Sequence, residues 1–283
     1  MVEVRTWSRS DTAQFVRMPV PRDDKYSRGV VALRTGSSAY PGAAVLGVEA
    51  AWRAGAGYVR YVGEGRAADA VLARRPETVA AADVGRTRVG AWVIGSGTDR
   101  AGRSDAETAA LREILAGDVA VVIDAGALDL VTGAAAPFVI TPHAGEFARL
   151  QETMGLRAGA SESREEAVVR VARAIGGAVL LKGSRTLVAD ESGHVIAVEE
   201  NTPWLATAGT GDVLAGVIGA VVAANPERPV AEAAASGAWL HGHAARIASG
   251  VVSGVVSAGD PGHPVVALDV ADALPRAVAD VLA

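Results

Sequence analysis

Short apolar segments alternate with longer segments of mixed polarity along most of the chain. The apolar runs are rich in β-branched residues and are four to five residues long, which is typical of strands. Strands are predicted at Val30–Leu33, Tyr58–Val62, Ala91–Ile94, Val119–Ile123, Phe138–Thr141, Val179–Lys182, Thr186–Ala189 and Val195–Val198. Alanine-rich segments between and after them predict helices at Gly42–Ala54, Asp105–Ala116, Gly145–Gln151, Ser161–Ile175, Thr210–Ala224, Val230–Ser249 and Val270–Leu282.

This alternation predicts an α/β protein with a doubly wound, mostly parallel sheet and helices on both faces. The turn residues around Asp190–Gly193 predict a hairpin that interrupts the alternation. The first 25 residues are polar and contain Pro19 and Pro21, so we expect residues 1–25 to run over the surface. With no repeat and no linker, residues 26–283 are predicted to form one domain.

Composition narrows the classes of function. Half of the 283 residues are hydrophobic, so a large core can form, and the net charge of −5 with no basic run argues against nucleic-acid binding. No cysteine is present, which excludes disulfides and thiolate metal sites. The N-terminus lacks an apolar signal region, and no segment is apolar enough to span a bilayer. We therefore expect a soluble cytoplasmic protein.

The most informative motif is Gly209-Thr210-Gly211-Asp212, directly before an apolar helix. Glycines let main-chain amides approach a ligand, and the helix N-terminus adds unpaired N–H groups, so the motif suits a phosphate. Asp212 there can accept a hydroxyl proton as a general base. The alternative is that Asp212 or Thr210 is only a helix cap. The chain has neither a Walker A loop nor a GxGxxG dinucleotide motif.

Two further motifs follow predicted strands, whose carboxyl ends meet at one sheet edge. In Thr141-Pro-His-Ala-Gly-Glu, His143 is a candidate substrate contact and Glu146 a candidate Mg²⁺ carboxylate, or else Pro142 starts a helix that Glu146 favours electrostatically. In Lys182-Gly-Ser-Arg-Thr, the lysine ends a buried strand and would be costly to bury without an anion. A tight turn with a solvated lysine explains the second motif equally well.

Other candidates are weaker. The segment Gly36–Ala44 and the run Gly95-Ser-Gly are close-approach points that plain turns also explain. Asp124 follows a strand and could bind a metal or a sugar hydroxyl, or cap the next turn. His241 and His243 are two positions apart, so on a helix they face different ways, which favours packing or hydrogen bonding over a metal pair.

These motifs, in this order, resemble the NAD(P)H-hydrate dehydratase family. The matching stretches are KYSRGVVALRTGSSAYPGAA, AAWRAGAGYV, VITPHAGEFARL, LLKGSRT, LATAGTGDVLAGVIGAVVA, GAWLHGHAA and the tail ALDVADALPRAV, nearly the whole chain after residue 25. The resemblance implies a ribokinase-like fold. It also implies that ADP or ATP, with Mg²⁺, phosphorylates the C6 hydroxyl of the S epimer of hydrated NADH or NADPH, and that phosphate elimination then restores NAD(P)H.

The resemblance also assigns residues. Asp212 is the base and a substrate contact, and Gly209, Thr210 and Gly211 form the anion hole. Ala43 or Ala44, Gly97 and His143 line the hydrate site, and Glu146 is the metal-shell residue. The nucleotide-binding residues are Lys182, Gly183, Ser184, Arg185, Thr186 and Gly211.

The sequence departs from the family pattern at three places. At Ala208 it has ATAGTGD, where the family has ATGGTGD. Ser96 lies in GSGTDR, where the family has GPGLG, and Gly126 replaces the second carboxylate of DAD. The family's epimerase domain does not precede this one, so a separate epimerase is the expected pathway partner, and a homo-oligomer is expected. A ribokinase-like kinase of a thiazole, pyrimidine or sugar alcohol is the alternative enzyme, and a non-catalytic nucleotide-binding protein is the alternative outside catalysis.

Overall fold

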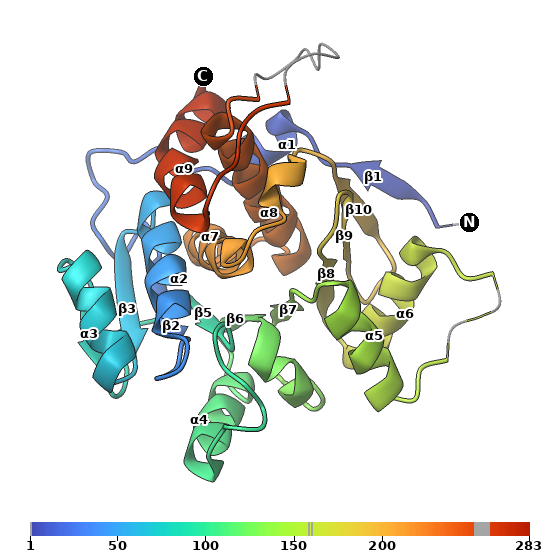
Figure 1. The fold of residues 1–283 in the computed structure, drawn as a ribbon, viewed down its shortest axis with the longest axis horizontal. Helices are drawn as coiled ribbons and strands as arrows, with labels where there is room; N and C mark the ends of the chain where they lie inside the picture. The colour runs from blue at the N-terminus through green and yellow to red at the C-terminus, as the bar shows by residue number, and fades with distance from the viewer. Residues whose placement is uncertain (1, 158, 160, 252–260) are drawn as a thin grey trace.

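The protein is described here from a computed structural model that covers residues 2–157, 159, 161–251 and 261–283. These residues contain one ten-stranded sheet in the order β1-β10-β9-β8-β7-β6-β5-β2-β3-β4 (Figure 1). In it, β9 alone runs antiparallel to its neighbours, because hairpins join β8 to β9 and β9 to β10. The strands are β1 Val4–Thr6, β2 Val30–Arg34, β3 Tyr58–Val62, β4 Val79–Ala81, β5 Ala91–Ile94, β6 Ala120–Ile123, β7 Phe138–Ile140, β8 Ala178–Leu181, β9 Thr186–Ala189 and β10 Val195–Val198.

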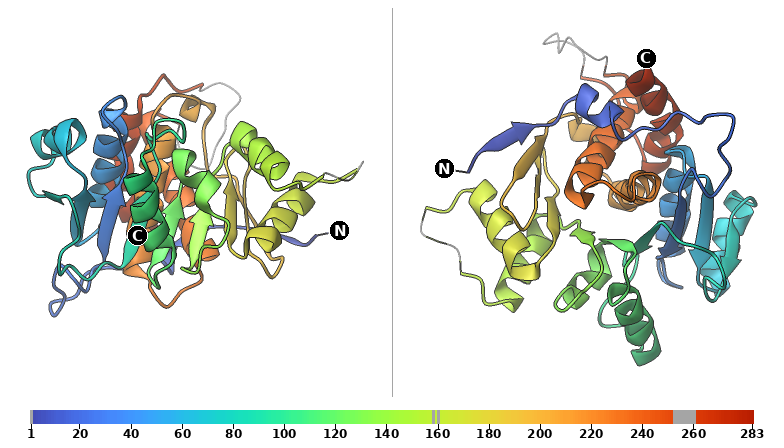
Figure 2. Two further views of the ribbon diagram at one scale, coloured as in Figure 1. Left: turned by 90° about the horizontal axis from the view of Figure 1, so that it is seen from below. Right: turned by 180° about the vertical axis from the view of Figure 1, so that it is seen from behind.

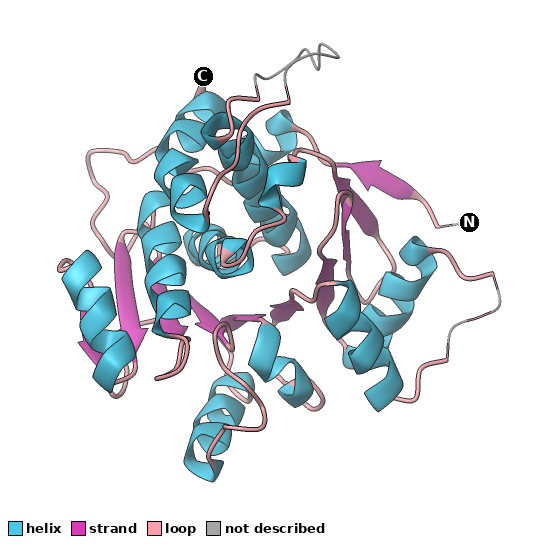
Figure 3. Cartoon of the chain, viewed as in Figure 1, coloured by secondary structure: helices cyan, strands magenta, loops and turns pink. Residues whose placement is uncertain are grey.

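Helices cover both faces of the sheet (Figures 2 and 3). Their bounds are α1 Arg9–Ala13, α2 Pro41–Arg53, α3 Gly65–Arg74, α4 Asp105–Leu115, α5 Ala144–Thr153, α6 Arg164–Ile175, α7 Thr210–Ala224, α8 Val230–Ala248 and α9 Ala267–Leu282, with 3₁₀ turns η1 Ala125–Leu130 and η2 Pro203–Leu205. One core lies under α2, α7, α8 and α9, and the other under α4, α5 and α6. The predicted doubly wound architecture is therefore confirmed.

The N-terminal segment differs from our prediction of a surface strip. Val4–Thr6 pairs in parallel with β10 and extends the sheet by one edge strand. Trp7 and Phe15 are both only 3% exposed and pack together in the core, at a ring-centroid distance of 5.9 Å. Two well-placed aromatic side chains thus anchor a stretch whose other residues are mostly polar.

The fold brings several loops to one edge of the sheet. The chain segments that follow β2, β5, β6, β7 and β8 all leave the carboxyl ends of parallel strands. Helix α7 packs against α2 and against the central strands β2, β5 and β6. Crevices for ligands form at such an edge in doubly wound sheets.

Candidate active site

Helix α7 begins with the glycine-rich motif. Gly209 is the N-cap in a left-handed conformation, with φ of 88°, and no side chain caps the helix. The Thr210 hydroxyl donates to the carbonyls of Leu205 and Thr207, at 3.0 and 2.9 Å, so it secures the preceding loop. Neither Thr210 nor Asp212 acts as the N-cap, and the alternative of a purely capping role is wrong. The first amides of α7 are left without a side-chain acceptor.

The glycines of α7 permit close packing. A Cβ on Gly209 would lie 2.6 Å from Leu46 Cδ1 of α2. One on Gly216 would lie 2.2 Å from the Gly47 carbonyl oxygen, and one on Gly219 would lie 2.4 Å from Val93 Cγ2. Gly216 and Gly219 therefore let α7 sit directly on α2 and on the sheet, which fixes the position of the helix N-terminus.

Asp212 lies in the first turn of α7 and is partly buried. Burial raises the pKa of its carboxyl to about 6, the nearby Asp124 carboxylate raises it too, and Lys182 offsets part of the rise. At neutral pH the carboxylate is still largely ionised, but it binds a proton far more readily than an ordinary aspartate. Such a group is suited to general-base catalysis.

Lys182 follows β8 and connects two parts of the site. Its Nζ donates to Asp124 Oδ1 at 3.0 Å, and a Cβ on Gly211 would lie 3.4 Å from the same Nζ. The ammonium group is therefore held between the end of β6 and the first turn of α7. The partner of this lysine in the structure is the buried Asp124 carboxylate, and the predicted contact with a nucleotide phosphate stays a prediction.

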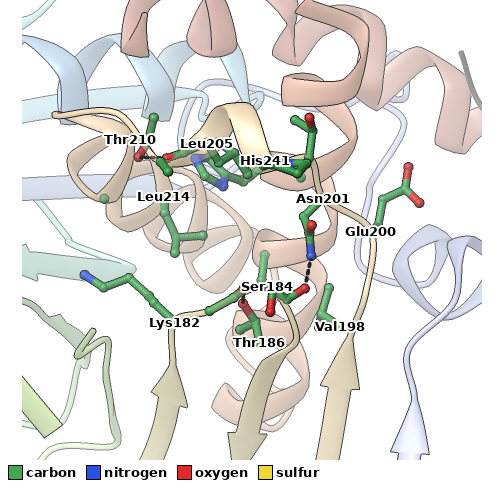
Figure 4. A pocket seen from close by; sticks show the side chains of 17 residues that line it. Lys182, Ser184, Thr186, Val198, Glu200, Asn201, Leu205, Thr210, Leu214 and His241 are labelled. Atoms are coloured by element: carbon green, nitrogen blue, oxygen red, sulfur yellow. Dashed lines mark hydrogen bonds between the residues drawn. The ribbon is translucent and has the colours of Figure 1, made fainter. Parts of the chain in front are cut away.

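A cavity of about 420 Å³ opens beside this cluster. Its walls come from the segment after β8, the loop after β10, the start of α7 and the middle of α8 (Figure 4). Figure 4 shows the His241 ring beside Thr210 and Leu205 on one side, and Ser184 and Thr186 on the other. Asn201 Nδ2 donates to the Ser184 carbonyl and joins two of the walls. This volume is in the range of small-molecule sites.

A second hollow, of about 800 Å³, lies where β2, β3 and β5 end. Gly36, Tyr40 and Thr98 are among the residues that line it. Next to it, a Cβ on Gly97 would lie 2.2 Å from Ala43 Cβ and 3.2 Å from Gly36 Cα. Helix α2, which carries Ala43, also reaches Asp212, since a Cβ on Gly47 would lie 3.6 Å from the Asp212 carbonyl oxygen. The Asp212 main chain thus lies beside α2, one turn after Ala43.

A model of the NAD(P)H-hydrate dehydratase family matches residues 31–253. The chain belongs to the NAD(P)H-hydrate dehydratase family. The bifunctional NAD(P)H-hydrate repair enzyme of Mycobacterium tuberculosis strain H37Rv is 45% identical over 243 residues, which are 82% of this chain and 48% of that protein. The chain therefore spans about half the length of this relative.

Two other proteins match over most of their length. The ADP-dependent (S)-NAD(P)H-hydrate dehydratase of Neisseria meningitidis serogroup B is 36% identical, with 81% of each chain covered. The ADP/ATP-dependent NAD(P)H-hydrate dehydratase of Bacillus subtilis, crystallised with ATP and Mg²⁺, is 25% identical and has a TM-score of 0.82 over 98% of this chain and 99% of its own. The predicted family and the ribokinase-like fold are confirmed.

Within this dehydratase fold, the predicted site residues separate into groups. Gly209, Gly211, Asp212 and Lys182 come together, and so do Ala43 and Gly97, whereas Ala44 is fully buried beneath Gly36. Lys182, Gly183, Ser184 and Thr186 line the cavity, but Arg185 does not. Its guanidinium instead pairs with Glu165 and Glu199. This partly buried arginine thus has two carboxylate partners on the protein, and its nucleotide-binding role stays a prediction.

His143 and Glu146 form a helix cap. His143 is the N-cap of α5, and its exposed ring accepts from the amides of Gly145 and Glu146. Glu146 Oε2 accepts from the His143 amide at 2.8 Å. The alternative with Pro142 as the first helical residue is wrong by two positions, since α5 begins at Ala144. Glu146 does lie in the first turn of the helix, where its negative charge is favourable. Ligand roles for both side chains stay predictions.

The sequence left two roles open for Asp124, ligand binding or capping, and it predicted the same packing or hydrogen-bonding role for His241 and His243. Asp124 makes no capping bond to η1, so the capping alternative is wrong. His243 hydrogen-bonds with Glu200 and Asp280, at 2.8 and 3.1 Å, which confirms the hydrogen-bonding prediction. His241 instead lines the cavity, and burial lowers its pKa to about 4, so the ring is neutral. Only the fold shows that the two residues do different things.

Gly126 occupies a crowded position. A Cβ on it would lie 2.3 Å from the Thr98 carbonyl oxygen, and its own carbonyl accepts from Arg103. A side chain there would displace the loop that carries Gly97. The departures at Ser96 and Gly126 thus lie in two neighbouring loops that contact each other. Among the described residues, no helix is both long and apolar enough to cross a membrane.

Proposed function

We propose that this chain catalyses the ADP- or ATP-dependent dehydration of the S epimer of hydrated NADH or NADPH. One observation carries the proposal: a partly buried Asp212, with its pKa near 6, lies in the first turn of α7. It directly follows Thr210 and Gly211, which line the Lys182 cavity, and its main chain lies beside α2 one turn after Ala43. Family membership supports it, as do relatives whose names state this activity.

In the proposed reaction, Asp212 accepts the proton of the C6 hydroxyl while that oxygen attacks the terminal phosphorus of the nucleotide. The bond from phosphorus to the bridging oxygen breaks, and AMP leaves from ADP, or ADP from ATP. The amides of Gly209, Thr210 and Gly211 stabilise the phosphoryl oxygens. The ring nitrogen's lone pair then expels phosphate from C6, and loss of a C5 proton restores the dihydropyridine.

The two hollows take different partners in this proposal. The nucleotide occupies the cavity lined by Lys182, Gly183, Ser184 and Thr186. The hydrated nicotinamide lies beside Ala43 and Gly97, with its hydroxyl at Asp212. His143 flanks the site from the start of α5. This arrangement brings the two reactants to one carboxylate from opposite sides.

Mg²⁺ belongs to the proposal as a companion of the nucleotide. In the described part of the chain, no group of three or more His, Asp or Glu side chains is arranged to hold a metal ion. Mg²⁺ commonly binds one or two carboxylates and otherwise waters and phosphates, so this donor set fits an ion that shares its ligands with ADP or ATP. Glu146 is the proposed carboxylate, and the ion would offset phosphate charge.

Three further expectations complete the proposal. An NAD(P)H-hydrate epimerase would convert the other epimer into substrate, in keeping with the bifunctional names of several relatives. A homo-oligomer and a cytoplasmic location stay predictions.

The hydrate repair assay tests the function. The protein is incubated with hydrated NADH or NADPH, Mg²⁺ and either ADP or ATP, and the near-ultraviolet absorbance of reduced nicotinamide is followed. We expect absorbance to recover and inorganic phosphate to appear in equal amount. Omission of nucleotide is the control. Phosphorylation of a thiazole, pyrimidine or sugar alcohol without any recovery would instead establish a kinase.

A further inference from the structure

Asp124 is a buried carboxylate to which three other strands send a donor. Ser96 Oγ, after β5, donates to Oδ2 at 2.9 Å, and Thr141 Oγ1, after β7, donates to Oδ1 at 2.8 Å. Lys182 Nζ, after β8, donates to Oδ1 at 3.0 Å. The Asp124 side chain is only 4% exposed. Four strand ends therefore converge on one charge at the centre of the proposed site.

This arrangement is not explained by local structure. Asp124 makes no capping bond to η1, which it precedes. Two neutral hydroxyls fix the orientation of the carboxylate, and the Lys182 ammonium group pairs with it. A buried carboxylate held in this way has a fixed position, and the cation that pairs with it shares that position.

The position of the Lys182 ammonium group indicates what the Asp124 carboxylate does. Lys182 Nζ lies at the first turn of α7, since a Cβ on Gly211 would come within 3.4 Å of it. The Lys182 side chain is 22% exposed and also lines the nucleotide cavity. Its ammonium group is thus held at the boundary between the nucleotide and the predicted anion hole.

We propose that Asp124 is a positioning residue that holds the Lys182 ammonium group against Gly211, where the phosphoryl group passes from the nucleotide to the substrate hydroxyl. This inference rests on the proposed function. It assigns Lys182 to the group being transferred, in addition to the nucleotide that remains. A lysine without this anchor has four rotatable bonds and spends much of its time elsewhere.

Asp124 also affects the base. The charged groups that act on Asp212 are Asp124 and Lys182, and His241, the nearby imidazole, is neutral. The negative charge of Asp124 favours the protonated form of Asp212, and the positive charge of Lys182 favours the ionised form. Removal of the Asp124 charge should therefore let Asp212 ionise at lower pH.

Four proteins test the proposal: Asp124→Asn, Lys182→Met, the double variant, and Asp118→Asn as a matched control. Asp118 precedes β6 at the opposite end from Asp124, so the control removes one aspartate from the same strand connection without touching the site. For each protein, kcat and the dissociation constant for ATP are measured, together with the pH dependence of kcat/KM.

We expect Asp124→Asn to lower kcat by about tenfold or more while ATP binds equally tightly or more tightly, because a negative charge near the phosphates is gone. Its acid limb should move to lower pH. Since Asp124 acts through Lys182, the double variant should have the kcat of Lys182→Met alone. Asp118→Asn should match the wild type in all three measurements.

Different outcomes would overturn the proposal. Additive losses in the double variant would mean that Asp124 acts independently of Lys182. An unmoved acid limb with equal losses in kcat and ATP affinity would mean a purely structural role, and an increased Mg²⁺ requirement would mean metal binding. If Asp124→Asn does not fold, Thr141→Val removes one anchoring hydroxyl at nearly constant volume and should lower kcat by a smaller factor, with ATP binding retained.

Two measurements need no turnover and separate this inference from the proposed function. The carboxyl of Asp212 is titrated by NMR with and without the Asp124 charge, and ATP binding is measured by calorimetry in all four proteins. If the wild type fails the hydrate assay but Asp124→Asn lowers the pKa of Asp212, the proposed function is refuted and the Asp124–Asp212 coupling is retained. An active enzyme with an unshifted titration would refute the inference alone.

Discussion

Gly97 lies so close to Ala43 that a Cβ on the glycine would come within 2.2 Å of the alanine Cβ. The two residues are on different elements, and their contact forms one side of the proposed hydrate site. Gly97 also has φ of 66°, a left-handed conformation that disfavours any side chain. Its absence of a side chain is therefore required twice, by space and by backbone conformation.

Gly97→Ala should weaken hydrate binding and spare the nucleotide. The new methyl group must displace Ala43, so we expect the KM for the hydrate to rise by about tenfold, with the ATP dissociation constant unchanged. Gly155→Ala is the matched control, because Gly155 also has φ of 66° but no atom within 4 Å of its ideal Cβ. Steady-state kinetics and calorimetry measure the two effects, and equal losses in both variants would remove the steric explanation.

Lys182 and Arg185 should differ sharply in nucleotide binding, although they are three residues apart. Lys182→Met removes the ammonium group from the cavity, and we expect ATP affinity to fall by about tenfold or more. Arg185→Ala should change it by less than about twofold, because Arg185 pairs with Glu165 and Glu199 outside the lining. Calorimetric titration with ATP measures both, and a large loss in Arg185→Ala would return this residue to the nucleotide site.

The α7–α2 contact should be sensitive to a single methyl group. Gly216→Ala would place a Cβ 2.2 Å from the Gly47 carbonyl oxygen, and we expect a loss of about 1–3 kcal/mol in the free energy of unfolding. Gly42→Ala in α2 is the control, since nothing lies within 4 Å of its ideal Cβ, and it should be neutral or slightly stabilising. Urea unfolding measures the free energy of unfolding of each variant. Equal values for the two variants would contradict the close contact.

The ionised Asp212 carboxylate should destabilise the folded protein. Its pKa is raised from 3.8 to about 6, so the folded state binds the proton more tightly than the unfolded state. The ionised carboxylate therefore destabilises the fold above pH 6, and this penalty disappears as the pH falls from about 6 to 4. Asp212→Asn should be more stable than the wild type by about 1–2 kcal/mol at pH 8 and by much less at pH 4. Denaturation curves at the two pH values check this, and a less stable variant at pH 8 would contradict the burial effect.

The same pKa predicts the acid limb of activity. Because Asp212 must be ionised to accept a proton, kcat/KM should fall as the pH drops below about 6. An acid limb near the ordinary aspartate value would mean that the base is in a solvated environment.

Much of the fold could be predicted from the sequence because the signals are local. Strands such as Ala91–Ile94 and the helix Thr210–Ala224 are uniform apolar runs with clear ends, and the structure has the same bounds. The prediction missed α3 and β4: Gly65–Arg74 was not recognised as a helix, and Val79–Ala81 has only three residues. It also missed β1. This strand pairs with β10, which lies about 190 residues later in the chain, so no local sequence pattern indicates the pairing.

The site shows the same division. Asp212 and its glycines form one continuous motif, so sequence reasoning could find them. Asp124 takes its meaning from Ser96, Thr141 and Lys182, which come from three other strands, and no spacing along the chain encodes that convergence. Arg185 lies inside a motif whose other residues line the cavity, yet its side chain pairs with Glu165 and Glu199, and its role in nucleotide binding stays a prediction. Side-chain direction depends on the partners that the fold supplies.

The central claim is that Asp212 is the base, and the most direct test compares turnover with nucleotide binding in Asp212→Asn. The account predicts that turnover of the hydrate falls by about a thousandfold while the ATP dissociation constant stays within about twofold of the wild type. Turnover retained to within tenfold of the wild type, in a folded variant that binds ATP, would contradict it.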